Sequence, residues 1–205
     1  MYRTVKNENA MPRPLSFDRD AAITAAMEVF WEHGYNHAPL SALTEATGLG
    51  KGSLYNAFGS KAELFALAFE EYQRRYSASV VAALNAPDLR AAIDGAFAAK
   101  VDCVLGRDRP PGCLAVGSLI DPPRDAPEIA ARVVAAVQTL ERLLKARLSQ
   151  AVEEGQLPAD ADPTALARAL TALLQGLAVT ARVTSDVEKL SDIRRGALAL
   201  LPITD

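Results

Sequence analysis

The chain has 205 residues, a formal net charge of −3 and an apolar fraction of 50%, values typical of one large or two small globular domains. No apolar run reaches the roughly 18 residues that a membrane-spanning helix requires, so we expect no membrane partner. The N-terminus shows no apolar secretory segment, and two cysteines are too few for a disulfide framework, so we expect a cytoplasmic protein with reduced thiols. Residues 1–60 carry five basic and six acidic side chains, so charge alone does not indicate a nucleic-acid partner.

The first half of the chain has the pattern of several helices with recognisable ends. Asp18 can cap a helix whose apolar residues recur at helical spacing, and Gly34 can end it. Ser60 and Glu63 have the spacing of a capping box, which begins a helix of about 36 Å if it is unbroken. We expect these helices over about residues 18–34, 39–47, 51–57 and 61–84.

The second half is rich in alanine and leucine and is divided by loops that contain proline and glycine. It shows no alternating β pattern and no internal repeat. The sequence therefore predicts an all-α protein of about nine helices. We expect the later helices over about residues 88–105, 127–154, 162–184 and 187–201, with a short apolar segment at 113–120.

The stretch GLGKGSLYNAFGSKAELF, residues 48–65, has the pattern of a helix-turn-helix. Gly48 would lie in the turn, and Leu54 and Phe58 would point inward. A major groove admits one helix, and backbone N–H groups at a glycine-rich helix start favour phosphate. Spacing alone leaves a second interpretation open, in which the segment is a tight helical corner with ordinary solvated side chains.

The segments VFWEHGY, LTEATGLG and KGSLYNAFGSKAELF together resemble the DNA-binding region of the TetR family of transcriptional repressors, over roughly residues 17–69. The resemblance implies a three-helix DNA-binding domain joined through its fourth helix to a ligand-binding domain. It also implies a homodimer that binds a double-stranded, palindromic DNA operator and is released by a small organic effector. We therefore expect an N-terminal arm and helix-turn-helix domain over 1–60, and a ligand-binding and dimerisation domain over 61–205, with helix 61–84 as the connector.

The family pattern also implies which residues contact DNA. Tyr55 falls on a phosphate-contacting aromatic position, Asn56 on a variable base-facing position, and Lys61 on a recurrent phosphate-contacting lysine. Ala38 and Gly50 depart from the Thr and Ser of many members, so one or two hydroxyl contacts are absent. The candidate DNA-binding residues are Lys51, Gly52, Ser53, Tyr55, Asn56 and Lys61.

We expect the effector pocket to be lined by the middle helices and to be mainly apolar, which suits a neutral or weakly polar organic ligand. Cys113 lies in a Gly-Cys-Leu segment that resembles a subgroup of the family in which some members respond to electrophiles or oxidants. Arg107 and Arg109 could help to lower its pKa. Alternatively, Cys113 is a small buried thiol that only packs. The candidate ligand-binding residues are Phe69, Tyr72, Phe97, Val101, Cys113, Val116, Leu119 and Gln175.

Leucines at helical spacing over about 162–184, with apolar residues over 187–201, suggest that these two helices form the dimer. The alternative is that both apolar stripes face the core of the monomer. A Cys103–Cys113 disulfide is not expected, because the two residues lie on different predicted elements.

We expect no enzyme activity, because no nucleophile elbow, phosphate loop, dinucleotide fingerprint or His-Glu-x-x-His pattern is present. His33 and His37 are separated by Gly34 and lack neighbouring ligands, so neither a metal nor a cofactor is expected. An all-α lyase, a helical binding protein and a structural scaffold remain open. A gel shift with the DNA upstream of the gene would distinguish these three classes from a repressor, because they would bind that DNA only without sequence preference.

Overall fold

The computed structural model describes residues 17–106 and 108–203, so the predicted arm at 1–16 and Arg107 lie outside the described residues. The described chain is all-helical, as expected, and has nine helices if the continuous α4, η1 and α5 are counted as one. In chain order the elements are α1 (Arg19–His33), α2 (Leu40–Thr47), α3 (Lys51–Phe58), α4 (Lys61–Tyr72), η1 (Gln73–Ser77), α5 (Ala78–Ala83), α6 (Leu89–Leu105), α7 (Leu114–Ile120), α8 (Pro127–Glu153), α9 (Pro163–Thr180) and α10 (Val187–Ala199).

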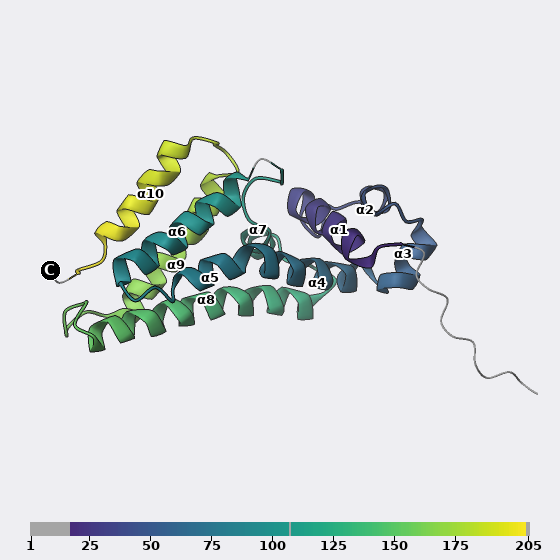
Figure 1. Ribbon diagram of the computed structural model, residues 1–205. Coiled ribbons are helices and arrows are strands. Elements are labelled where there is room, and N and C mark those ends of the chain that lie inside the picture. The colour runs from purple at the N-terminus through teal and green to yellow at the C-terminus, as the bar shows by residue number, and fades with distance from the viewer. Residues whose placement is uncertain (1–16, 107, 204–205) are drawn as a thin grey trace, which may run out of the picture.

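The helices form an elongated molecule with a small group, α1 to α3, at one end (Figure 1). Helix α4 packs against α1 and continues through η1 and α5 into the larger group (Figure 1). There α8 pairs with α9, while α10 covers α6 and α9. The connector therefore belongs to both groups, because its first half packs with α1 and its second half with α6.

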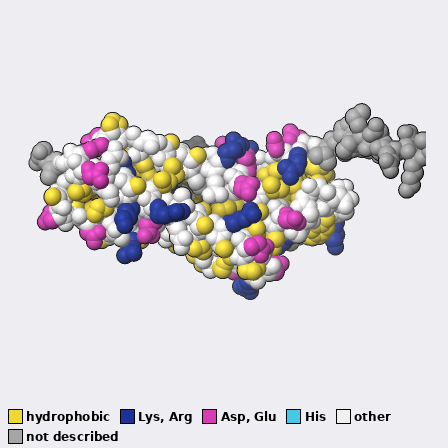
Figure 2. All heavy atoms as spheres, turned by 90° about the horizontal axis from the view of Figure 1, so that it is seen from below, with side chains coloured by type: hydrophobic (Ala, Val, Ile, Leu, Met, Phe, Trp, Pro, Cys, Tyr) yellow, Lys and Arg dark blue, Asp and Glu magenta, His cyan; other side chains and the backbone are white. Residues whose placement is uncertain are grey.

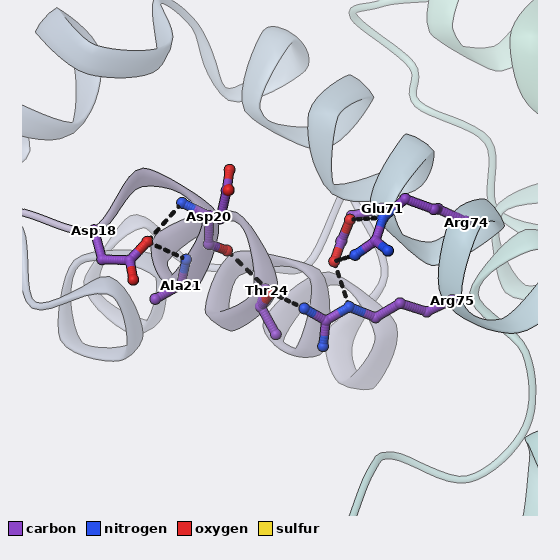
Figure 3. Close-up of polar contacts among 7 residues, drawn as sticks. All are labelled: Asp18, Asp20, Ala21, Thr24, Glu71, Arg74 and Arg75. Carbon is purple, nitrogen blue, oxygen red and sulfur yellow. Dashed lines mark hydrogen bonds and ion pairs between the residues drawn. The ribbon is translucent and has the colours of Figure 1, made fainter.

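Local sequence signals determine where the first helices begin and end. The Asp18 carboxylate accepts hydrogen bonds from the backbone N–H groups of Asp20 and Ala21, both at 3.0 Å (Figure 3). Ser60 and Glu63 form the predicted capping box, with Ser60 N donating to the Glu63 carboxylate at 2.7 Å. Gly48 lies between α2 and α3 at φ 67°, a backbone conformation that glycine adopts without strain.

The connector is not a regular α-helix along its whole length, which differs from the unbroken helix considered for residues 61–84. Residues 73–77 form a π-helical turn, η1, between α4 and α5. A π turn holds one residue more than the corresponding α turn and often occurs at functional sites. Here Gln73, Tyr76 and Ser77 line a mainly apolar cavity of the larger group.

Aromatic side chains form a continuous core that runs from α1 along the connector. Phe65 has its ring centroid 5.0 Å from that of Phe30, and Trp31 lies edge-on to Tyr72 at 4.9 Å. All four side chains are at most 2% exposed. Because dense aromatic packing tolerates little displacement, this core joins the small helical group to the cavity wall.

The leucine stripe predicted on residues 162–184 lies mostly inside the monomer. Leu170, Leu174 and Leu177 are 0%, 2% and 0% exposed, because α9 packs against α6 and α8. Their proposed place in a dimer interface is therefore wrong, and the alternative of a core-facing stripe is correct for these three. The exposed side of α9 instead carries small residues, including Ala172 and Gly176.

Candidate DNA interface and central cavity

Helices α2 and α3 form a helix-turn-helix whose inner side is apolar. Leu43, Leu54 and Phe58 are 1%, 2% and 5% exposed, so they anchor both helices on the core. The residues of α3 that were predicted to contact DNA are exposed to solvent. They are Lys51, Gly52, Ser53, Tyr55 and Asn56.

The start of α3 is open and lacks a side-chain cap. Gly50 is the N-cap residue and makes no capping hydrogen bond through a side chain. A Cβ atom at Gly50 or Gly52 would meet nothing within 4 Å, so the packing of the described chain does not require glycine there. The first N–H groups of a helix carry a partial positive charge that suits phosphate. The two glycines leave space for a backbone phosphate to approach these groups.

Lys61 occupies a less exposed position than the other candidates. Its ammonium group lies 5.0 Å from the ring centroid of Tyr35, a cation–π geometry. Burial lowers the pKa of Lys61, and the nearby Asp125 carboxylate opposes that shift. Lys61 therefore helps to fix the start of α4 against the turn that follows α1, in addition to its predicted phosphate contact.

Figure 2 shows basic and acidic side chains interspersed on one face of the molecule, so charge does not mark a DNA interface on that face. The exposed residues of α3 and its open start indicate the interface instead.

Replacing Tyr55 by alanine is expected to weaken operator binding about tenfold or more and to change the free energy of unfolding by less than about 0.5 kcal/mol. Tyr55 is 37% exposed, so its side chain contributes little to the core. Fluorescence anisotropy with operator DNA and urea unfolding measure the two quantities. Tyr55→Phe is the matched control that keeps the ring. Unchanged affinity, or a large loss of stability, would contradict the assignment.

The central cavity, of about 200 Å³, lies between the connector and helices α6, α7, α8 and α9. Five of the eight predicted ligand-binding residues line it, namely Phe69, Tyr72, Cys113, Val116 and Gln175. Phe97, Val101 and Leu119 are not among its lining residues, and Phe97 is fully buried in the core. Lining residues that were not predicted include Tyr76, Lys100, Cys103, Leu140 and Leu174.

A polar cluster lies in the mainly apolar wall of the central cavity. The Tyr72 hydroxyl donates to Cys113 Sγ at 3.0 Å and lies 3.6 Å from Cys103 Sγ. Lys100 Nζ donates to Cys113 Sγ at 3.1 Å. Both cysteines are free thiols. Lys100 and Cys103 are one turn apart on α6, a spacing that could have indicated their shared face.

The two thiols differ in acidity. Burial opposes ionisation of Cys113, but the Lys100 charge and the hydrogen bonds from Tyr72, Lys100 and the Val116 backbone outweigh it, so its pKa is lowered. Burial dominates at Cys103 and raises its pKa. The pKa of Tyr72 is raised by burial and by the charge on Cys113, which keeps the phenol protonated as a donor. Cys113 is therefore the nucleophilic thiol of the pair.

Replacing Lys100 by methionine is expected to raise the pKa of Cys113 and to slow its alkylation at neutral pH about tenfold for each unit of pKa. The rate falls because the reacting thiolate becomes scarcer when the pKa rises above the pH, and the two rates converge at high pH. Iodoacetamide alkylation followed by mass spectrometry across pH measures this, with Cys103 replaced by serine in both proteins. Lys100→Arg keeps the charge and is the control. Identical pH profiles for the parent and K100M would contradict the role of Lys100.

The two histidines lie beside carboxylates and form no metal centre. His33 Nε2 is 3.9 Å from Glu32, and His37 Nε2 is 3.4 Å from Asp121. Among residues 17–106 and 108–203, no group of three or more histidine, cysteine or carboxylate side chains could hold a metal ion. No helix in the same ranges is both long and apolar enough to cross a membrane.

Two family models match the chain. The model of bacterial regulatory proteins, tetR family, matches residues 22–68, and that of the tetracyclin repressor-like C-terminal domain matches residues 93–197. The chain belongs to the TetR family of transcriptional regulators.

The sequence similarity between this TetR-family protein and its relatives extends along nearly the whole chain. The HTH-type transcriptional repressor ComR of Escherichia coli (strain K12) is 35% identical over 192 residues, which is 93% of this chain and 91% of ComR. A cysteine mutant of the TetR family regulator CifR, complexed with 26-bp double-strand operator DNA, has a TM-score of 0.87 and 33% identity. That match covers 93% of this chain and 100% of the CifR chain. The relatives are transcriptional regulators, so this TetR-family protein is a regulator and not an enzyme.

In this TetR-family protein the wall of the central cavity also contacts α1. Tyr72, which donates to Cys113, packs edge-on against Trp31 of α1. Arg75 of η1 donates to the Thr24 hydroxyl of α1 at 2.8 Å and pairs with Glu71 (Figure 3). Displacement of the connector at the cavity would therefore move α1.

Proposed function

We propose that the protein is a ligand-responsive repressor of the cytoplasm that binds a palindromic operator as a homodimer. In this proposal residues 1–60 bind DNA, and residues 61–205 bind the effector and dimerise, with 61–84 as the connector. A two-fold symmetric dimer with one α3 helix in each major groove requires a palindromic site. The exposed residues of α3 and the complex of CifR with operator DNA support this proposal.

The effector is a small organic electrophile that reacts with Cys113. The observation that carries this proposal is the hydrogen bonding of Cys113 by both Tyr72 and Lys100 at a cavity wall, which favours the thiolate. The other lining groups are mostly apolar, which suits an uncharged carbon skeleton. A buried thiolate that is reached through such a cavity would react selectively with molecules that fit it.

An α,β-unsaturated carbonyl compound would react with Cys113 by conjugate addition. The Cys113 thiolate forms a sulfur–carbon bond to the β-carbon, and the π electrons of the carbon–carbon double bond move to form an enolate. The enolate then takes a proton from solvent or from the Lys100 ammonium. No oxidant or metal takes part.

Release from the operator would follow from the contacts between the cavity and α1. An adduct on Cys113 displaces the Tyr72 side chain, which packs on Trp31. The shift in operator affinity is limited by the difference in effector affinity between the DNA-bound and released conformations. Movement of α1 in each protomer changes the separation of the two α3 helices.

The test is operator release by N-ethylmaleimide, with adduct formation followed in the same samples by intact-mass spectrometry. We expect release to parallel modification of Cys113 and to be lost in Cys113→Ser. Cys103→Ser is the matched control and should still release, because Cys103 is the less acidic thiol. If C113S is released as readily as the parent, the thiol only packs and the effector is a reversible ligand of the central cavity.

A further inference from the structure

A second cavity, which we call the junction cavity, lies where the end of α1 meets α7 and the end of α9. Its volume is about 440 Å³, and it shares only Cys113 and Val116 with the central cavity. Its polar lining residues are Trp31, His33, His37, Ser118, Asp121, Arg124 and Arg182. The Asp121 carboxylate pairs with Arg124 at 3.3 Å and lies 3.4 Å from His37 Nε2. Neither the DNA interface nor the electrophile chemistry proposed above uses the polar groups of Trp31, Ser118 and Arg182.

Two hydrogen-bond donors in the wall of the junction cavity have no protein partner. Within residues 17–106 and 108–203, Trp31 Nε1 and Ser118 Oγ are buried and make no hydrogen bond. Both residues are 2% exposed. Buried polar groups in native proteins are nearly always satisfied, because an unpaired donor loses its hydration without compensation. This wall therefore suits a molecule that brings hydrogen-bond acceptors.

Arg182 adds a positive charge to the same cavity. Its guanidinium donates to the carbonyl oxygens of Trp31 at 3.0 Å and Glu32 at 3.3 Å. Arg182 has no carboxylate within ion-pair distance in the described part of the chain, whereas the neighbouring Arg124 pairs with Asp121 at 3.3 Å. An arginine can bind a carboxylate through two parallel hydrogen bonds, so its remaining N–H groups favour such a ligand.

Much of the wall is apolar and includes the side chains of Phe30, Leu114, Ala178 and Val179. Apolar surface with a few convergent polar groups is the usual composition of a site for a small organic molecule. An inorganic anion would leave this apolar surface without contact, whereas a carboxylate with a hydrocarbon part would cover it.

We propose that the junction cavity binds a small organic monocarboxylate. The carboxylate pairs with Arg182 and accepts hydrogen bonds from the unpartnered donors, and the hydrocarbon part packs on the apolar wall. The site is separate from the effector function of Cys113, so either proposal can fail without the other. Since its wall joins α1 to α7 and α9, an occupant contacts both helical groups.

Trp31 is the only tryptophan of the chain, so its signals report directly on this cavity. We would titrate acetate, butyrate and benzoate at constant ionic strength, and follow the indole fluorescence and the single indole N–H resonance in a ¹⁵N-labelled protein. Benzyl alcohol is the uncharged counterpart of benzoate. We expect a saturable response to benzoate or butyrate, at least tenfold tighter than for acetate or benzyl alcohol. No response to any carboxylate, or an equal response to benzyl alcohol, would overturn the proposal.

Three variants locate the site. Arg182→Gln and Ser118→Ala should each weaken carboxylate binding, by about tenfold for R182Q, with circular dichroism confirming that helicity is retained. Arg132→Gln, an exposed arginine of α8 paired with Glu70, is the matched control and should have no effect. Lys100→Met should also have no effect. If K100M abolishes binding while R182Q and S118A do not, the carboxylate occupies the central cavity and the proposal is wrong.

Discussion

Phe65→Ala is expected to lower the free energy of unfolding by about 3–5 kcal/mol, a large part of the stability of an ordinary domain. The Phe65 side chain is 0% exposed, and its ring lies 5.0 Å from Phe30, 5.2 Å from Tyr35 and 6.1 Å from Phe69. Truncation would leave a cavity between α1 and α4 that these rings cannot fill without moving. The melting temperature should fall by roughly 6–20 °C.

Denaturant unfolding measured by circular dichroism provides the test, together with operator binding well below the new melting temperature. Phe65→Leu is the control, because it removes less volume and should cost less than about 1.5 kcal/mol. Operator binding should fall along with stability, because Phe65 holds α4 against α1. A loss of less than 1 kcal/mol in F65A would show that the packing between α1 and α4 is not tight.

Introducing glutamate at Ala172 and Leu200 is expected to convert the proposed dimer into a monomer and to weaken operator binding about 100-fold or more. Both residues are exposed on the monomer, Leu200 by 48%, so the substitutions should leave its core intact. Four buried carboxylates in a self-complementary interface would lose hydration and repel one another. A monomer also loses the gain in affinity that comes from binding two half-sites together.

Multi-angle light scattering determines the mass, and anisotropy with the full operator determines the affinity. Ala82→Glu, at an exposed position of α5, is the matched control for adding a charge. The proposal predicts a helical monomer for the double variant and a dimer for the control. A double variant that stays dimeric at nanomolar concentration would place the interface on other helices.

The DNA-reading part of the site could be predicted from sequence because its determinants are local. The two helices, the glycine turn and the alternation of buried Leu54 and Phe58 with exposed Tyr55 and Asn56 all lie within a short segment. Helical spacing alone therefore separates the anchoring residues from the exposed ones. The capping box at Ser60 is local in the same way, and the structure confirms it.

The cavity could be predicted only in part, because helical spacing gives a face but not the neighbour that the face meets. Phe97 precedes Cys103 by six residues on α6, which places them about 120° apart around the helix at 3.6 residues per turn. Of these two residues, only Cys103 lines the central cavity. Lys100, Tyr72 and Cys113 come from α6, α4 and the start of α7, so their contacts depend on tertiary packing that no local pattern encodes.

The leucines of α9 show the same limit in another form. An apolar stripe indicates that a surface of the helix must be buried, but it does not distinguish burial in the core of the monomer from burial against a partner subunit. Leu170, Leu174 and Leu177 are buried by α6 and α8 within one chain. The outward side of α9 is marked by small residues, which give a weaker sequence signal than leucine.

The π turn at residues 73–77 determines where the connector tolerates a change in length. Each residue of a regular α-helix turns the chain by about 100° and advances it by about 1.5 Å. A π turn completes nearly the same rotation with one residue more, so deleting one residue of η1 would restore regular α geometry and leave the direction of α1 to α3 nearly unchanged. Deleting one residue from a regular α segment of the connector would instead rotate α1 to α3 about the connector axis by roughly 100°. The connector thus has a phase, and one codon lost outside η1 would redirect α3 away from the groove.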